Sequence, residues 1–131
     1  MHRVFALPLG CIALALALGC GGPSTTTVYG KITYQGKPAT SGLINFKADK
    51  QKPIGGGIQP DGSYEYDLPV GAYQVRIETP PQPPAGWKEG DPTTKMGPRQ
   101  IPEKYGDFVG SGLTVTVTDD AGSQEVDFNL Q

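Results

Sequence analysis

The side chains that most often act in catalysis near neutral pH are confined to the start of this sequence. The one histidine is His2, and the two cysteines are Cys11 and Cys20. Histidine is the usual general base, and a cysteine thiolate is the strongest common nucleophile. If processing removes the residues before Cys20 and modifies that cysteine, no histidine and no free thiol remain. The remaining chain would then lack a Ser-His-Asp site, a Cys-His site and the usual zinc ligands.

Two pairs of carboxylates, Glu65 with Asp67 and Glu125 with Asp127, could in principle cleave a glycosidic bond. A spacing of two places both members of a pair on one face of a strand, and the apolar neighbours mark the other face as buried. We therefore interpret both pairs as solvated charge. Gly55-Gly56-Gly57 lacks the Lys-Ser/Thr of a phosphate loop. The sequence thus predicts that the protein is not an enzyme and has no catalytic residue, metal or cofactor.

The first twenty residues have the composition of an export signal. Arg3 precedes an apolar run from Val4 to Leu18, and Gly19 comes directly before Cys20. This run is shorter than the ~20 residues that a membrane-spanning helix needs. A positive start, a short apolar run and a small final residue are typical of a cleaved signal. We therefore predict a signal peptide over 1–19, a tether over 20–27 and one domain over 28–131.

Ala17-Leu18-Gly19-Cys20 resembles the lipobox of bacterial lipoproteins. In that family the cysteine thiol receives a diacylglycerol and becomes the mature N-terminus. The resemblance implies lipidation at Cys20 and attachment to a membrane of the bacterial envelope. By the family's sorting rule, Gly21 rather than Asp after the cysteine implies the outer membrane, with the domain facing the periplasm or the cell surface. The alternative is an ordinary secretory signal in which Cys20 is incidental.

From Val28 onward, apolar residues alternate with polar ones in seven stretches of about six residues. Strands that are apolar on one face must bury that face, and two packed sheets do so. The 19 glycines and 13 prolines fit short strands joined by tight turns. We expect an all-β fold, a seven-stranded antiparallel β-sandwich in which residues 119–123 form a hairpin loop between the last two strands. The residues expected to face inward include Ile32, Phe46, Tyr66, Val75, Val115 and Phe128.

Three segments, over 28–38, 58–64 and 68–75, resemble the carboxypeptidase regulatory-like, or transthyretin-like, domain. They match its G-x-V strand and G-x-P turn, its D-G-x-Y hairpin and its P-x-G-x-Y-x-V strand. The resemblance implies a prealbumin-like or Ig-like sandwich. Residues 101–105, Ile-Pro-Glu-Lys-Tyr, are similar to a segment of small exported lipoproteins of planctomycete-like bacteria. Transthyretin-like enzymes that hydrolyse 5-hydroxyisourate use His, Arg and a C-terminal Tyr-Arg-Gly-Ser, and the C-terminal residues 127–131 do not match that motif.

The segment from Thr79 to Gly112 has no strand pattern and is rich in proline and glycine. Loops beyond about 12–15 residues are uncommon in compact domains and usually have a function or are disordered. One interpretation is a recognition loop that presents an aromatic and cationic surface. The other is an inert cover, with Ile101, Tyr105 and Phe108 attaching it to the sandwich edge and Trp87 capping an apolar seam. The candidate binding residues are Trp87, Lys88, Arg99, Lys104 and Tyr105.

These features together predict a non-catalytic, membrane-anchored lipoprotein that acts as a structural or interaction module of the cell envelope. The alternative is a module that binds a polysaccharide or another ligand through the 79–112 loop. The expected partners are the membrane, through the lipid anchor, and envelope proteins or polysaccharide. A formal net charge of -2 provides no basic field, so no nucleic acid is expected.

Overall fold

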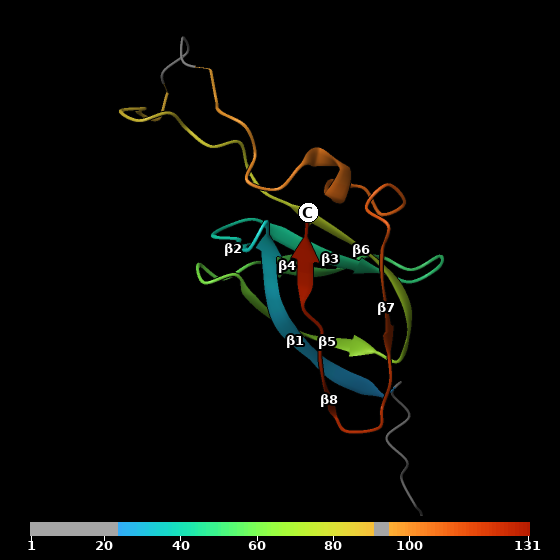
Figure 1. Ribbon diagram of the computed structural model, residues 1–131. Coiled ribbons are helices and arrows are strands. Elements are labelled where there is room, and N and C mark those ends of the chain that lie inside the picture. The colour runs from blue at the N-terminus through green and yellow to red at the C-terminus, as the bar shows by residue number, and fades with distance from the viewer. Residues whose placement is uncertain (1–23, 91–94) are drawn as a thin grey trace, which may run out of the picture.

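The computed structural model describes residues 24–90 and 95–131. The predicted signal peptide, the lipidation site Cys20 and the first part of the tether lie outside these residues. Within the described chain, no helix has the length and apolar character needed to cross a membrane. The described chain is all-β and consists of two sheets, as the alternation of apolar residues predicted (Figure 1).

The first sheet is built around β1 (Thr25–Tyr34), which has neighbours along both of its edges. β5 (Ser63–Pro69) and β2 (Lys37–Pro38) pair with it antiparallel, whereas β8 (Ser123–Glu125) and β9 (Phe128–Leu130) pair with it parallel. The second sheet has the order β4-β3-β6-β7 and is antiparallel throughout. Its strands are β4 (Ile54–Gly57), β3 (Leu43–Lys47), β6 (Gly71–Glu78) and β7 (Leu113–Val117).

Three details of the predicted architecture are wrong. The described residues form nine strands rather than seven, because the two-residue β2 escapes a periodicity search and the last predicted strand is divided into β8 and β9. Their pairing with β1 is parallel, so the sandwich is not purely antiparallel. β1 also begins at Thr25, which pairs with Pro69, so the last three residues of the predicted tether belong to the strand.

The predicted terminal hairpin does not form. β7 pairs with β6 in the second sheet, whereas β8 and β9 belong to the first, so residues 118–122 carry the chain across the sandwich. Alternation of apolar residues locates a strand but does not specify its partner. The side chain of Gln124 joins β8 to β7 and the residue after it, where backbone pairing is absent. The Gln124 amide donates to the Thr116 carbonyl (2.8 Å) and accepts from the Thr118 N–H (3.2 Å).

Gly30 explains the break between β8 and β9. A Cβ at this position would lie 2.0 Å from the Val126 carbonyl oxygen, so only glycine permits the approach. The Val126 N–H donates to the Tyr29 carbonyl (2.8 Å), and the Lys31 N–H donates to Asp127 Oδ1 (2.9 Å). The Tyr64 hydroxyl donates to the Val126 carbonyl beneath Gly30. The chain therefore bends at 126–127 and resumes its pairing with β1 as β9.

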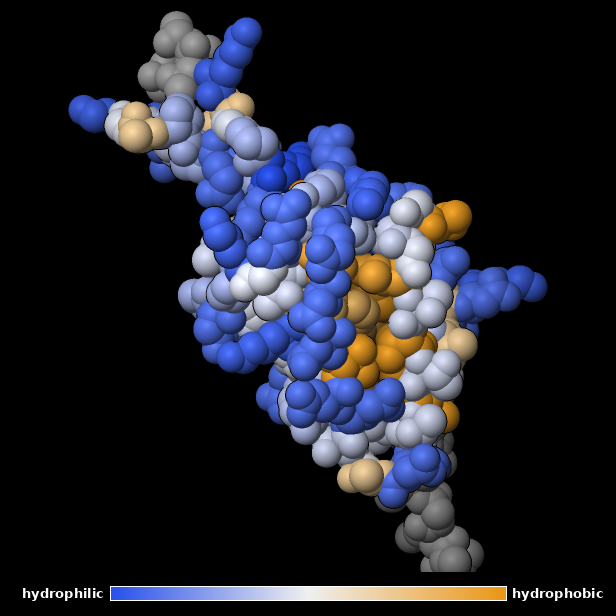
Figure 2. Space-filling view, viewed as in Figure 1, coloured by the Kyte–Doolittle hydropathy of each residue, from blue (hydrophilic) through white to orange (hydrophobic). Residues whose placement is uncertain are grey.

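The core lies between the two sheets and contains five of the six residues expected there. Ile32, Phe46, Val75, Val115 and Phe128 are buried. The sixth, Tyr66, is only half-buried, because its ring extends to the sheet edge, where its hydroxyl donates to the Gly57 carbonyl (2.7 Å). Aromatic rings fill the centre of the core. Ring centroids lie 5.9–6.5 Å apart in three pairs: Phe46 with Tyr64, Phe46 with Tyr73, and Tyr64 with Phe128. A strip of hydrophobic surface is visible beside β7, where the two sheets are not joined by strand pairing (Figure 2).

Candidate functional site

The long segment after β6 has two structurally different parts. Residues 81–90 and 95–99, which we call the arm, extend away from both sheets (Figure 1). Residues 100–112, which we call the cover, pack on the end of the sandwich and include the 3₁₀ helix η1 (Glu103–Gly106). The cover is the part of the segment to which the predicted attachment by Ile101, Tyr105 and Phe108 refers, and the recognition role stays a prediction.

The two legs of the arm run side by side at its base. Pro81 and Arg99 form an isolated antiparallel bridge. Beyond it, the Gly97 N–H donates to the Gln82 carbonyl (2.6 Å), and the Gln82 N–H donates to the Pro98 carbonyl (3.4 Å). The prolines contribute no N–H and fix their own φ angles. The base is thus a short two-stranded ladder with little backbone freedom.

A buried threonine joins this base to the sandwich. Thr79 is 1% exposed, and its Oγ1 accepts a hydrogen bond from the Ile101 N–H (3.0 Å). Its carbonyl oxygen accepts from Arg99 Nη1 (2.6 Å), and Arg99 Nε lies 3.4 Å from Glu103 Oε1. The guanidinium therefore ties the returning leg of the arm to β6 and to η1.

Gln100 makes a second attachment, on the first sheet. Its Nε2 donates to the Pro38 carbonyl (2.8 Å), and its Oε1 accepts from the Thr40 N–H (3.1 Å). One of these backbone groups belongs to β2 and the other lies just after it, so the chain at the arm base is held from two sheets at once.

The cover is held by one aliphatic and two aromatic residues. Ile101 is 1% exposed, and Tyr105 is 7% exposed with its hydroxyl donating to the Gln131 carbonyl (2.9 Å). Phe108 packs on the outer face of the second sheet, where the Arg76 guanidinium lies 4.8 Å from its ring centroid and Lys47 Nζ lies 5.7 Å from it. These contacts attach the segment as the cover interpretation expected of Ile101, Tyr105 and Phe108.

The five candidate binding residues do not form one site. Trp87 and Lys88 belong to the outer arm, where the Trp87 side chain is half-buried and the Trp87 backbone N–H donates to the Pro84 carbonyl (3.1 Å). Arg99 lies at the arm base. Lys104 and Tyr105 lie on η1, with Lys104 Nζ 4.8 Å from the Tyr105 ring centroid. Tyr105 is a packing residue, and Trp87 lies on the arm rather than on an apolar seam of the sandwich.

Sequence reasoning did not single out the groove at the arm base. This groove, of about 620 Å³, is lined by residues of the arm, the cover and the end of β1, among them Tyr34, Pro81, Met96 and Pro98. Met96 is 43% exposed. The sequence offered only a weak signal for this groove. Tyr34 is the last residue of a predicted strand, and nothing in the sequence indicates that Pro81 and Pro98 lie close together.

The groups with perturbed acidity belong to the sandwich. Burial, with a smaller contribution from the Asp127 charge, raises the pKa of Tyr64 far above its usual range. Burial also raises the pKa of Tyr73, whose hydroxyl donates to the Pro69 carbonyl (2.6 Å). At the surface, hydrogen bonds from Ser63 lower the pKa of Asp61. In the part of the chain that the structure describes, no three His, Cys, Asp or Glu side chains gather as a metal site would require.

Comparison with known proteins gives two similar structures. No protein-family model and no curated protein matches the chain. A DUF3823 family protein from Parabacteroides merdae ATCC 43184 is 16% identical, with a TM-score of 0.49, and the match covers 82% of this chain and 46% of that one. A DUF3823 family protein from Bacteroides ovatus ATCC 8483 is 21% identical, with a TM-score of 0.46 and coverages of 81% and 44%. The chain thus spans less than half the length of either. The carboxypeptidase regulatory-like and lipoprotein resemblances stay predictions.

Proposed function

We propose that this protein is a non-catalytic, membrane-anchored lipoprotein of the bacterial cell envelope and an interaction module whose binding element is the arm. The proposal includes the finer assignment of the fold to the prealbumin-like, carboxypeptidase regulatory-like sandwiches, which rests on the sequence motifs. The observation that supports the binding role is the arm itself: its base is fixed to the sandwich by buried hydrogen bonds, while its outer part extends away from both sheets.

The position of the arm fits an anchored module. β1 begins at Thr25, shortly after Cys20, at the end of the sandwich opposite the arm (Figure 1). A lipid on Cys20 would therefore hold the opposite end of the domain at the membrane. The arm would face away from the lipid surface, where an envelope protein or polysaccharide can reach it.

The construction of the arm also favours binding. Association costs free energy for each flexible segment that becomes ordered, and a prepaired, proline-rich base reduces that cost. Trp87 offers the type of side chain that most often dominates an interface. Lys88 and Lys95 are both exposed, and their charges favour approach of an anionic surface.

A variant without the outer arm tests the proposal. Residues 83–96 are replaced by a short Gly-Ser turn, which leaves the Pro81–Arg99 bridge and the cover in place. Retention on isolated native envelope material should be lost, while the melting temperature should fall by no more than about 4 °C, the equivalent of about 1 kcal/mol. Full retention without the arm would disprove its binding role.

Point variants separate binding from packing. Trp87→Ala and Lys88→Ala should each weaken retention without lowering the melting temperature. The matched control is Val109→Ala in the cover, since Val109 is 76% exposed and lies outside the arm. If Trp87→Ala lowers the melting temperature by many degrees, the indole is a packing group and the arm is structural.

A further inference from the structure

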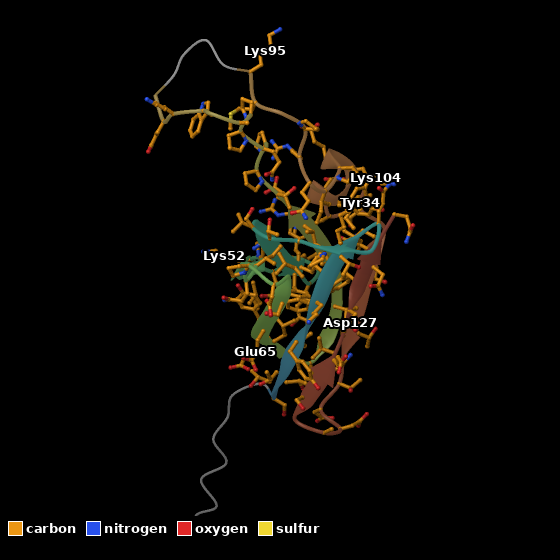
Figure 3. All side chains as sticks on the ribbon, turned by 60° about the vertical axis from the view of Figure 1, so that its left-hand side comes forward. Tyr34, Lys52, Glu65, Lys95, Lys104 and Asp127 are labelled. Atoms are coloured by element: carbon orange, nitrogen blue, oxygen red, sulfur yellow. The ribbon has the colours of Figure 1, made fainter. Side chains whose placement is uncertain are left out.

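A second groove runs over the outward face of the first sheet around β1 and reaches the β5 edge, where Gly57 and Tyr66 line it. It has a volume of about 640 Å³, within the range of roughly 300–1,000 Å³ of small-molecule sites. Tyr29 lies at its centre and is 39% exposed. In the strand register, Glu65 of β5 is its partner on one side and Glu125 of β8 on the other. Figure 3 shows Glu65 and Asp127 on either side of β1.

The polar groups at the centre of this face are not engaged with one another. On the same face, Thr27 Oγ1 donates to Asp67 Oδ1 (2.7 Å) and Thr33 Oγ1 donates to Asn129 Oδ1 (2.9 Å), so the cross-strand pairs to either side are satisfied. Among the described residues the only ion pair joins Arg99 and Glu103, although Lys31 lies in the same groove as Glu65 and Glu125. These carboxylates and the Lys31 ammonium are therefore free to bind a ligand.

The mixture of groups defines the ligand chemistry. The Tyr29 ring offers a flat apolar face, the carboxylates accept hydrogen bonds, and Lys31 donates them. Gln59, which also lines the groove, does both. The three carboxylates of the groove, those of Glu65, Glu125 and Asp127, would repel an anionic polymer. They would attract a cationic peptide, but such a peptide would leave the Lys31 donor unpaired. A neutral sugar has an apolar C–H face and hydroxyl groups that both donate and accept, so it can use every group in the groove.

We propose that this groove binds a neutral oligosaccharide. The Tyr29 ring stacks against the C–H face of one sugar ring, Glu65 and Glu125 accept hydrogen bonds from its hydroxyls, and Lys31 donates to a hydroxyl or ring oxygen. The site uses no residue of the arm, so it stands or falls separately from the proposed function.

Titration with cellotetraose, maltotetraose and mannotetraose, followed by NMR and calorimetry, tests this site. At least one of the three should bind with a Kd of about 1 mM or tighter. Tyr29→Ala should weaken that binding at least about tenfold, and Tyr29→Phe should leave it within about twofold, because the ring face persists. Binding of none of the three sugars would overturn the proposal, as would an unchanged Kd in Tyr29→Ala.

A charge-matched pair of variants separates the site from general electrostatics. Glu65→Gln with Glu125→Gln should weaken sugar binding at least about fivefold, since hydrogen bonds to charged acceptors are the stronger ones. Asp119→Asn with Asp120→Asn, which removes the same charge from an exposed loop, should have no effect. Equal effects of the two double variants would overturn the assignment. So would tighter binding of an acetylated tetralysine peptide that depends on Glu65 and Glu125, because the groove would then be a site for cationic peptides.

Discussion

Replacing Gly30 by alanine should unfold the junction between β8 and β9. The added Cβ would lie 2.0 Å from the Val126 carbonyl oxygen and 2.6 Å from its carbonyl carbon. Both atoms belong to the backbone, so no side-chain rotation relieves the overlap. The chain at 126–127 must move by more than an ångström, or β1 must separate from it.

The size of the effect follows from what that movement breaks. Three hydrogen bonds fix the junction: Val126 N–H to the Tyr29 carbonyl, Lys31 N–H to Asp127 Oδ1, and the Tyr64 hydroxyl to the Val126 carbonyl. Each contributes about 1 kcal/mol net, and overpacking adds a further 1–3 kcal/mol or so. Alanine also lowers the backbone entropy of the unfolded chain, which offsets about 0.4–1 kcal/mol of this loss of stability. The free energy of unfolding should therefore fall by about 3–5 kcal/mol, which corresponds to a melting temperature lower by roughly 12 °C or more.

Urea unfolding followed by circular dichroism measures this loss, and the chain supplies its own control. Gly57 also lies in a strand, its φ is not in the left-handed region, and a Cβ there would meet no atom within 4 Å. Gly57→Ala should leave the protein as stable as before or slightly more stable. If Gly30→Ala and Gly57→Ala differ by less than about 1 kcal/mol, the close crossing beneath β1 is wrong.

Phe128→Ala should cost about 3–5 kcal/mol in urea unfolding because the ring is buried, and Tyr66→Ala should cost clearly less because that ring is only half-buried. Cys20→Ser should abolish labelling by a clickable fatty acid and move the protein to the soluble fraction, and unchanged labelling would contradict the lipoprotein assignment. Because its pKa is raised in the fold, Tyr64 keeps a proton above pH 10 that the unfolded chain releases, so stability should fall as the pH rises past that value. Tyr64→Phe removes the hydrogen bond of the hydroxyl and should lower the free energy of unfolding by about 1 kcal/mol near neutral pH. In denaturant titrations above pH 10, the free energy of unfolding of this variant should fall less steeply than that of the wild type. An equally steep fall would refute this role of Tyr64.

The alternation of apolar residues was sufficient to locate the longer strands but not to pair them. Phe46, Val75 and Val115 were placed on the inward face correctly because a strand exposes alternate residues to opposite sides. The same rule could not show that the strand of Val115 and the strand of Phe128 belong to different sheets. Partner choice depends on contacts between distant segments, such as the one that Gly30 permits with Val126. The one local sign of this close contact was Gly30 itself, a glycine at a position of the strand where the alternation calls for an apolar side chain.

The candidate site was predictable in the same partial way. The length and proline content of residues 79–112 marked the segment as unusual, and Ile101 and Tyr105 were expected to attach it. Proline is concentrated in the arm, but glycine recurs in both parts, and no local pattern marked where the arm ends and the cover begins. Thr79 had no distinctive pattern, yet it is the buried residue on which the arm base depends. Glu65 and Glu125 were interpreted as solvated charge, and the groove around Tyr29 emerges only when β5 and β8 are set beside β1.

Strand β1 connects the end of the domain near the proposed membrane anchor to the end that carries the arm. This strand has ten residues, which at about 3.3 Å per residue span roughly 33 Å. It begins near the proposed anchor and ends at Tyr34, which lines the groove at the arm base. Hydrogen-bonded neighbours flank it on both edges, so β1 is the central strand of the first sheet. A load applied to the arm of an anchored molecule would therefore pass along a paired central strand rather than through a loop. That arrangement suits a domain that holds a binding element at a fixed distance from a membrane.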